Sequence, residues 1–328
     1  MTFVIHNYLI LDSFVYFYHI YTSYMPFKKN SGMNEKALLI GNDINNATES
    51  YSWLDLMNGL LEYARIDRKL NQVNKPFPLF YEEIYLNSAR ALQRTEIQIK
   101  KHIASQTKKM NPNQLHKSIL DLEIENILTT NYDLSFEITS GLEPKKCQNK
   151  GFIKENSYNL FRFHQTENHK IWHIHGSQTV PKSITLGYEH YSGFLQQMRN
   201  YVATGTKGNY KKKDFLPLSK RIKNNEVNYE SWIDLFFTND IYIFGLNLDF
   251  VEMHLWWLIN YRARVMVENR FPITNKIYYF YPKKYEKDSK HKLEMFKING
   301  VETIAEKLER DNKTEYYERI IKRIKNGI

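Results

Sequence analysis

Short apolar runs alternate with segments of helical periodicity along most of the chain. The apolar runs predict buried strands at 36–41, 126–131, 170–176, 240–245 and 276–281. Apolar residues at helical spacing predict helices at 51–65, 80–92, 115–122, 250–267 and 316–325. Buried strands separated by helices are typical of a parallel sheet covered on both faces. The sequence therefore predicts an α/β, Rossmann-like fold with a mostly parallel sheet.

Polar residues gather where the predicted strands end. Those at or just after a strand's carboxyl end are Asn42, Asp43, Asn131, Asp133, His175, Asn247 and Asp249. Ligands of such sheets bind beyond the carboxyl ends of the strands, so we expect four loops to converge on one crevice. The stretches near 55–122 and 187–230 are helical or polar in character and are interpreted as helical insertions around it.

Residues 1–32 form an apolar N-terminal extension, and we expect 33–328 to form the folded domain. The extension has no basic residue before Lys28, so it lacks the charge pattern of a signal peptide. A membrane-spanning helix would carry Asp12 into hydrocarbon at about 2.5–3.5 kcal/mol. An added amphipathic helix, a membrane anchor and a natural start at Met33 stay open for this segment. We expect a cytoplasmic protein without membrane contact.

Charge and cysteine content narrow the classes of partner. The formal net charge of +10 favours anionic partners, but no helix-turn-helix, zinc-finger or RNA-recognition signature accompanies it. Nucleic acid is therefore not expected as a partner. The chain has one cysteine, Cys147, which excludes an intramolecular disulfide framework and a zinc site built from several thiolates.

Four segments in order along the chain resemble motifs of the sirtuin-like (Sir2-like) family, specifically its bacterial branch of NAD-consuming antiphage defence proteins. They are Leu39–Asn45 (LIGNDIN), Thr129–Asp133 (TTNYD), Ile174–Gly176 (IHG) and Phe244–Asp249 (FGLNLD). The resemblance covers about 36–281 and implies an NAD-binding domain. It implies catalytic roles for Asn131 and His175, and nucleotide contacts from Gly41, Asn42, Asp43, Asp133, Gly245, Asn247 and Asp249.

The residue chemistry is compatible with these roles. A neutral imidazole at His175 can accept a proton near neutral pH, and the amide of Asn131 can orient a water or a ribose hydroxyl. His173 lies two residues earlier on the same predicted strand and should face the same side, so it is the alternative base. Asp43 stands where the family more often has glycine. It either opposes a bound pyrophosphate or caps the following helix.

The function predicted from this resemblance is NAD+ glycohydrolysis, giving nicotinamide and ADP-ribose, in an abortive-infection antiphage effector. NAD+ is then the substrate, and no metal is expected. The resemblance also implies control by homo-oligomer assembly, by an activating partner protein or by a phage component. The alternatives are a non-catalytic nucleotide sensor and an NAD-dependent deacylase, which is disfavoured because sirtuin deacylases carry a zinc ribbon of four cysteines.

Overall fold

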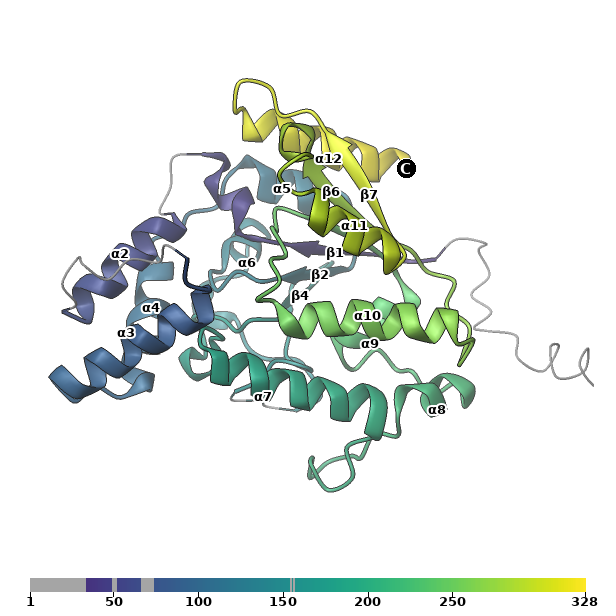
Figure 1. Ribbon diagram of the computed structural model, residues 1–328, viewed down its shortest axis with the longest axis horizontal. Coiled ribbons are helices and arrows are strands. Elements are labelled where there is room, and N and C mark those ends of the chain that lie inside the picture. The colour runs from purple at the N-terminus through teal and green to yellow at the C-terminus, as the bar shows by residue number, and fades with distance from the viewer. Residues whose placement is uncertain (1–33, 49–51, 66–73, 154, 156) are drawn as a thin grey trace, which may run out of the picture.

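A seven-stranded sheet organises the computed structural model, which describes residues 34–48, 52–65, 74–153, 155 and 157–328. The strand order is β3-β4-β2-β1-β5-β6-β7 (Figure 1). The strands are β1 (Lys36–Ile40), β2 (Asn126–Thr129), β3 (His164–Gln165), β4 (Lys170–His173), β5 (Asp240–Phe244), β6 (Ile277–Pro282) and β7 (Val301–Glu306). Every neighbouring pair is parallel except β3 on β4. The predicted mostly parallel sheet is confirmed.

The central strand β1 is buried on both faces because nearly all its side chains are apolar. Leu39 packs into one core and Leu38 and Ile40 into the other, which is the alternation of an extended strand. β1 pairs with β2 on one side and with β5 on the other, so the direction of strand addition reverses at β1. Such a switch point opens a crevice at the carboxyl ends of the strands.

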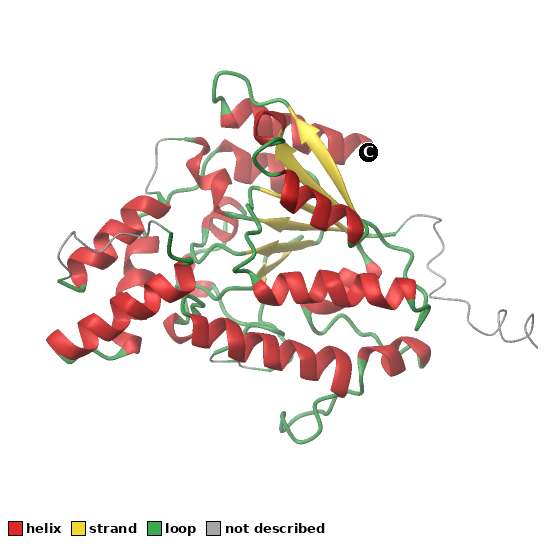
Figure 2. Cartoon of the chain, viewed as in Figure 1, coloured by secondary structure: helices red, strands yellow, loops and turns green. Residues whose placement is uncertain are grey.

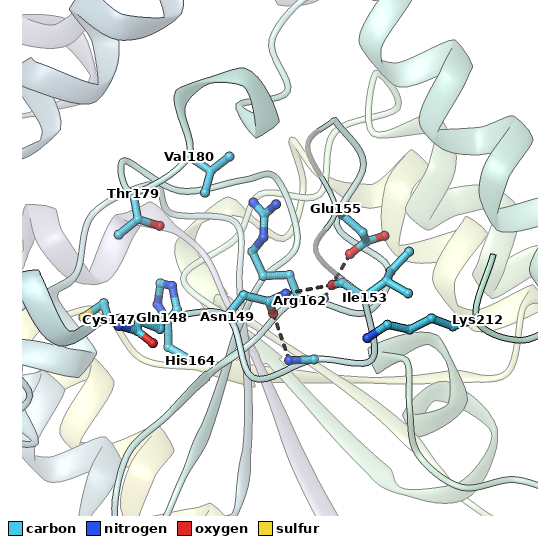
Figure 3. Close-up of a pocket in the computed structure, with 11 residues that line it drawn as sticks. Cys147, Gln148, Asn149, Ile153, Glu155, Arg162, His164, Thr179, Val180 and Lys212 are labelled. Carbon is cyan, nitrogen blue, oxygen red and sulfur yellow. Dashed lines mark hydrogen bonds between the residues drawn. The ribbon is translucent and has the colours of Figure 1, made fainter. Parts of the chain in front are cut away.

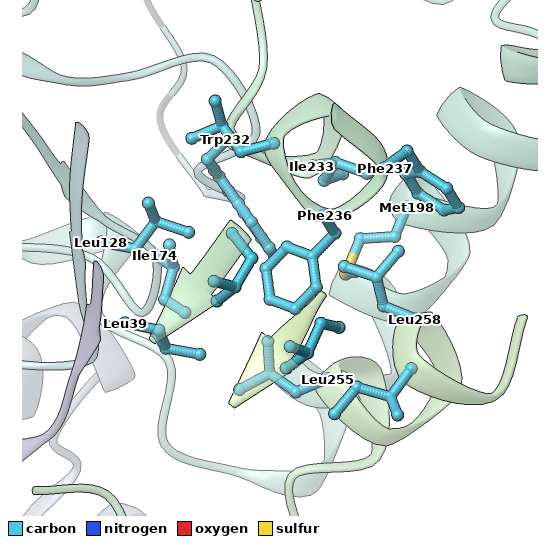
Figure 4. Close-up of a cluster of buried hydrophobic side chains, with 14 of the residues drawn as sticks. Leu39, Leu128, Ile174, Met198, Trp232, Ile233, Phe236, Phe237, Leu255 and Leu258 are labelled. Atoms are coloured by element: carbon cyan, nitrogen blue, oxygen red, sulfur yellow. The ribbon is translucent and has the colours of Figure 1, made fainter. Parts of the chain in front are cut away.

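Helices cover both faces of the sheet (Figure 2). On one face lie α7 (Tyr188–Arg199), α8 (Leu218–Lys223), α9 (Trp232–Thr238), α10 (Met253–Val267) and α11 (Lys290–Ile298). Their apolar side chains form the larger core with Leu39, Leu128 and Ile174 (Figure 4). On the other face lie η1 (Asn42–Ala47), α5 (Gln114–Leu120), α6 (Ser135–Thr139) and α12 (Lys313–Asn326). The helix-covered Rossmann-like architecture follows from these two layers.

A third group of helices stands beyond the carboxyl ends of the central strands, at the left of Figure 1. It consists of α2 (Trp53–Tyr63), α3 (Phe77–Leu92) and α4 (Glu96–Thr107). A capping box between Ser52 and Asp55 starts α2, and the three helices share a buried cluster that includes Tyr132 and Ile184. These helices lie within the predicted insertion at 55–122, whereas α5 at its end packs against the sheet. The insertion and domain boundaries stay predictions.

Five of the seven strands and five helices coincide with the predicted segments; β3, β7 and several helices were not predicted. The short elements between them are η2 (Pro144–Lys146), η3 (Pro181–Ser183), η4 (Asn200–Thr204) and η5 (Lys283–Tyr285). Among the helices of the described residues, none has the length and apolarity needed to cross a bilayer. The predicted extension at 1–32 lies outside the described residues.

Candidate functional site

A small cavity of about 120 Å³ lies at the carboxyl ends of β1, β2 and β4, under the helices α2 and α3. It brings together three of the predicted site residues, Asn42, Asn131 and His175. The complete lining is Asn42, Trp53, Leu56, Phe77, Thr107, Met110, Thr130, Asn131, Tyr132, His175, Tyr191 and Glu252. All four loops reach the cavity, but the loop after β5 contributes Glu252 and not the predicted Asn247 or Asp249.

Asn131 presents a free amide to this cavity. The residue is 5% exposed, yet among the described residues neither its Oδ1 nor its Nδ2 has a hydrogen-bond partner. Its backbone is held firmly, because its N–H donates to Thr129 Oγ1 at 3.1 Å and its carbonyl accepts from His173 Nδ1 at 2.8 Å. A buried amide that satisfies none of its own hydrogen bonds is rare in folded proteins and indicates a place for a ligand or water.

His175 lies in a turn that follows β4. Gly176 has a φ of +93°, and a Cβ at this position would come within 2.2 Å of the Ser183 carbonyl oxygen, so the turn needs glycine. His175 Nε2 is 3.0 Å from Nε2 of His254 and 3.3 Å from Oε2 of Glu252, both of which belong to or directly precede α10. One imidazole of the pair donates and the other accepts.

Burial keeps this group of side chains uncharged near neutral pH. Desolvation lowers the pKa of His175 to about 3 and that of His254 well below its usual range. Burial also raises the pKa of Glu252 to about 8, against the hydrogen bond from Tyr191 that lowers it. Glu252 is therefore the group of this site whose charge changes just above neutral pH.

The expectation that His173 and His175 face the same side is wrong. The turn at 174–175 ends the strand alternation, so His175 reaches α10, whereas His173 points to α6 on the opposite face of the sheet. There Oε1 of the fully buried Glu137 lies 2.7 Å from His173 Nε2 and 2.6 Å from His164 Nδ1. His173 supports the Asn131 carbonyl and does not line the cavity.

The negative charge of Glu137 favours the protonated form of His173. Desolvation would raise its pKa and lower that of His173, but their mutual attraction outweighs it, so the pKa of Glu137 falls to about 2 and that of His173 rises. Both ring nitrogens of His173 face acceptors, a carbonyl and a carboxylate, which is the arrangement of an imidazolium.

Asn45 connects two of the predicted contacts. Its Nδ2 donates to Asn42 Oδ1 at 2.8 Å and to Asp133 Oδ2 at 3.0 Å. The second oxygen of Asp133 accepts the backbone N–H of Ser135 at 2.9 Å. Asp133 therefore holds the loop after β2 against the loop after β1.

Asp43 points away from the strand ends toward α12. Its Oδ1 accepts from Lys313 Nζ and its Oδ2 from the Tyr317 hydroxyl, both at 2.6 Å. No side chain caps η1, so Asp43 does not have the capping role considered from the sequence. Its charge is compensated by Lys313.

Gly41 and Gly245 place the loops after β1 and β5 in direct contact. A Cβ on Gly41 would lie 2.3 Å from the Gly245 carbonyl oxygen, and Gly245 has a φ of +66°. Asn247 and Asp249 follow on the exposed side, where Lys292 Nζ donates to Asn247 Oδ1 at 2.6 Å. Neither residue lines the cavity.

Sequence reasoning missed Glu252, His254 and Tyr191. The first two lie three and five residues after Asp249, on the turn and helix that follow the motif, where their polarity within an apolar segment was a usable signal. Tyr191 comes from α7, which lies in the stretch near 187–230 that was interpreted as a helical insertion without a helix being bounded there.

Two groups among the described residues have ligand atoms close enough to hold a metal ion, namely Glu137, His164 and His173, and His175, Glu252 and His254. Two imidazoles and a carboxylate form a set that binds zinc. In the second group a metal would take the lone pair that His175 needs as a base.

Comparison with known proteins agrees with the motifs. Residues 125–227 match the SIR2-like domain family, a range that contains the segments around Asn131 and His175. No curated protein matches the chain. Residues 125–227 are therefore similar to a SIR2-like domain and lie within the α/β fold that was predicted from the sequence.

Proposed function

We propose that the chain is an NAD+ glycohydrolase. The observation that carries the proposal is the buried amide of Asn131, whose two polar atoms are unpartnered in the same cavity as His175. The SIR2-like domain supports an NAD-related role in general. A volume of about 120 Å³ suits one ring or sugar of a dinucleotide, so the adenosine half has to extend along the crevice toward Gly41 and Gly245.

In the proposed reaction the bond between the ribose C1′ and the nicotinamide nitrogen breaks, and its electron pair neutralises the pyridinium. The ribose is left as an oxocarbenium-like species, and water adds to C1′ while releasing one proton. Asn131 orients the water or a ribose hydroxyl, and His175 receives the proton. This role requires the pKa of His175, which burial lowers to about 3, to rise in the reacting complex. Glu252, once ionised, lies 3.3 Å from His175 Nε2 and stabilises the resulting imidazolium.

The alternative of a non-catalytic sensor loses its main support. That alternative rested on repulsion between Asp43 and a pyrophosphate, and Lys313 compensates this charge at 2.6 Å. Deacylation stays disfavoured because the one cysteine cannot form a zinc ribbon. The roles as an antiphage effector and in an assembly with itself or an activator remain proposals from the resemblance.

The test is chromatography of the products after purified chain is incubated with NAD+, with and without EDTA. We expect nicotinamide and ADP-ribose, a loss on the order of 10²–10⁴-fold in His175→Ala, and a comparable loss in Asn131→Ala. His291→Ala, at an exposed histidine, is the matched control and should retain activity.

NAD+ binding is measured by calorimetry on the same samples. Binding without product in the wild type, unchanged by Asn131→Ala, would refute the proposal. Stoichiometric O-acetyl-ADP-ribose from an acetyl-lysine peptide would indicate a deacylase. Loss of activity on EDTA treatment would indicate that the His175 group holds a metal and not a free base.

A further inference from the structure

A second and larger cavity, of about 660 Å³, is lined by residues from the part of the chain between β2 and α8. Its walls come from residues within 147–153, from Glu155 and Arg162, from β3, from the turn at Thr179–Val180 and from Lys212 (Figure 3). None of its lining residues lines the cavity of Asn131 and His175. Its volume is in the range of pockets that bind small molecules.

The wall of this cavity contains a buried cation that forms no salt bridge with any described residue, although the charge of Glu155 acts on it from nearby. Arg162 is 3% exposed, and within the described part of the chain its Nε and Nη1 have no hydrogen-bond partner. In Figure 3 its side chain rises between Val180 and Glu155. Guanidinium N–H groups that are removed from water without an acceptor cost free energy. The arrangement indicates that the acceptor is a ligand.

Glu155 is the carboxylate of this cavity, and its oxygens are already engaged. Oε1 accepts from the N–H of Leu160 at 2.9 Å, and Oε2 from those of Phe161 and Arg162 at 2.8 and 3.0 Å. It therefore binds the backbone of the loop that carries Arg162, and no ion pair joins it to the guanidinium among the described residues. Desolvation raises the pKa of Glu155 to about 7, which reduces its negative charge at neutral pH.

A second cation approaches from another segment. Lys212 lines the cavity and donates through Nζ to the Phe152 carbonyl at 3.2 Å, which leaves donor capacity on the ammonium group. The Thr179 hydroxyl lies in the same wall and contacts Ser177 Oγ at 2.6 Å. Two cations from separate segments suit a group of more than one negative charge, such as a phosphate.

We propose that this cavity binds a small phosphorylated molecule, with Arg162 and Lys212 contacting its phosphate. The volume of about 660 Å³ leaves room for an organic part of the ligand beyond the phosphate. The site is independent of the proposed NAD+ chemistry, because it shares no lining residue with that cavity.

The first test compares Arg162→Met with the wild type in the full chain. Without ligand the variant should unfold at the same or higher denaturant concentration, because it lacks the unpaired buried charge. Inorganic phosphate and ribose 5-phosphate, at millimolar concentrations, should stabilise the wild type, whereas ribose should not. Calorimetry should give a dissociation constant for ribose 5-phosphate about 10- to 100-fold weaker in Arg162→Met.

Lys212→Met tests the proposal independently of Arg162, because Lys212 is exposed and its replacement should not affect folding. It should weaken ribose 5-phosphate binding, whereas Lys211→Met, at the exposed neighbouring lysine, should bind as the wild type does. Asn131→Ala should also bind normally, which separates this cavity from the candidate site. Equal phosphate stabilisation of wild type and Arg162→Met, no stabilisation by either phosphate probe, or a loss of ligand-free stability in Arg162→Met would each overturn the proposal.

Discussion

Replacement of Asp43 by glycine tests whether this carboxylate serves the ligand or the fold. In the structure it joins the loop after β1 to α12 through Lys313 and Tyr317, both at 2.6 Å. The Asp43 side chain is 40% exposed and that of Lys313 33%, whereas Tyr317 is 2% exposed. The two contacts should therefore differ in their contribution to stability.

The magnitude follows from these exposures. A partly exposed ion pair contributes about 0–1 kcal/mol. Loss of the acceptor leaves the buried Tyr317 hydroxyl unsatisfied, at a cost of about 1–3 kcal/mol. We therefore expect Asp43→Gly to lower the free energy of unfolding by about 1–4 kcal/mol, well above the few tenths expected for an exchange of Asp for Gly at a helix N-cap. NAD+ affinity should stay unchanged, because the carboxylate is already paired with a cation.

Urea unfolding of a double-mutant cycle measures these contributions. Tyr317→Phe removes the hydroxyl and should cost about 0.5–1.5 kcal/mol. The double variant contains no unsatisfied hydroxyl, so its loss should fall short of the sum of the single losses by about 0.5–3 kcal/mol. Calorimetry with NAD+ is run on the same proteins. An Asp43→Gly variant with unchanged stability and tighter NAD+ binding would refute the reasoning and restore the clash with a pyrophosphate.

Two further predictions concern the site. Burial raises the pKa of Glu252 from 4.5 to about 8, so its contribution to stability is full below pH 4.5 and is lost as the pH rises to about 8. The free energy of unfolding of Glu252→Gln, measured in urea at successive pH values, should therefore rise relative to that of the wild type between pH 4.5 and 8. A constant difference between the two proteins over this range would contradict the prediction. Gly41→Ala should lose about 1–3 kcal/mol because its Cβ would lie 2.3 Å from the Gly245 carbonyl oxygen, and wild-type unfolding would contradict the close packing.

The inner strands were predictable because their local pattern agrees with their final environment. β1 lies between two other strands and packs against an apolar core on each face. A continuous apolar run such as Ala37–Ile40 is typical of a strand buried in this way. β7 lies at the edge, and most of its side chains are partly exposed, so its sequence gives no such run. The two-residue β3 depends on its pairing with β4 and on a bridge to Asn149, neither of which a local pattern contains.

The sequence identified the site residues that follow a recognisable strand, but not the contacts between distant parts of the chain. Asn131 and His175 were found because each follows a recognisable strand. The direction of the His175 side chain depends on a turn that needs Gly176, so strand alternation failed there. The partners of Asp43 come from α12, 270 and 274 residues further along the chain, and no local pattern contains them.

The buried carboxylate of Glu137 connects residues on the sides of both cavities. Its Oε1 is shared by His164, which lines the Arg162 cavity, and by His173, which holds the Asn131 carbonyl. A single buried oxygen atom therefore ties together α6, β3, β4 and the loop that carries Asn131. The position of Asn131 beside its cavity depends on this contact as much as on the strand that precedes it.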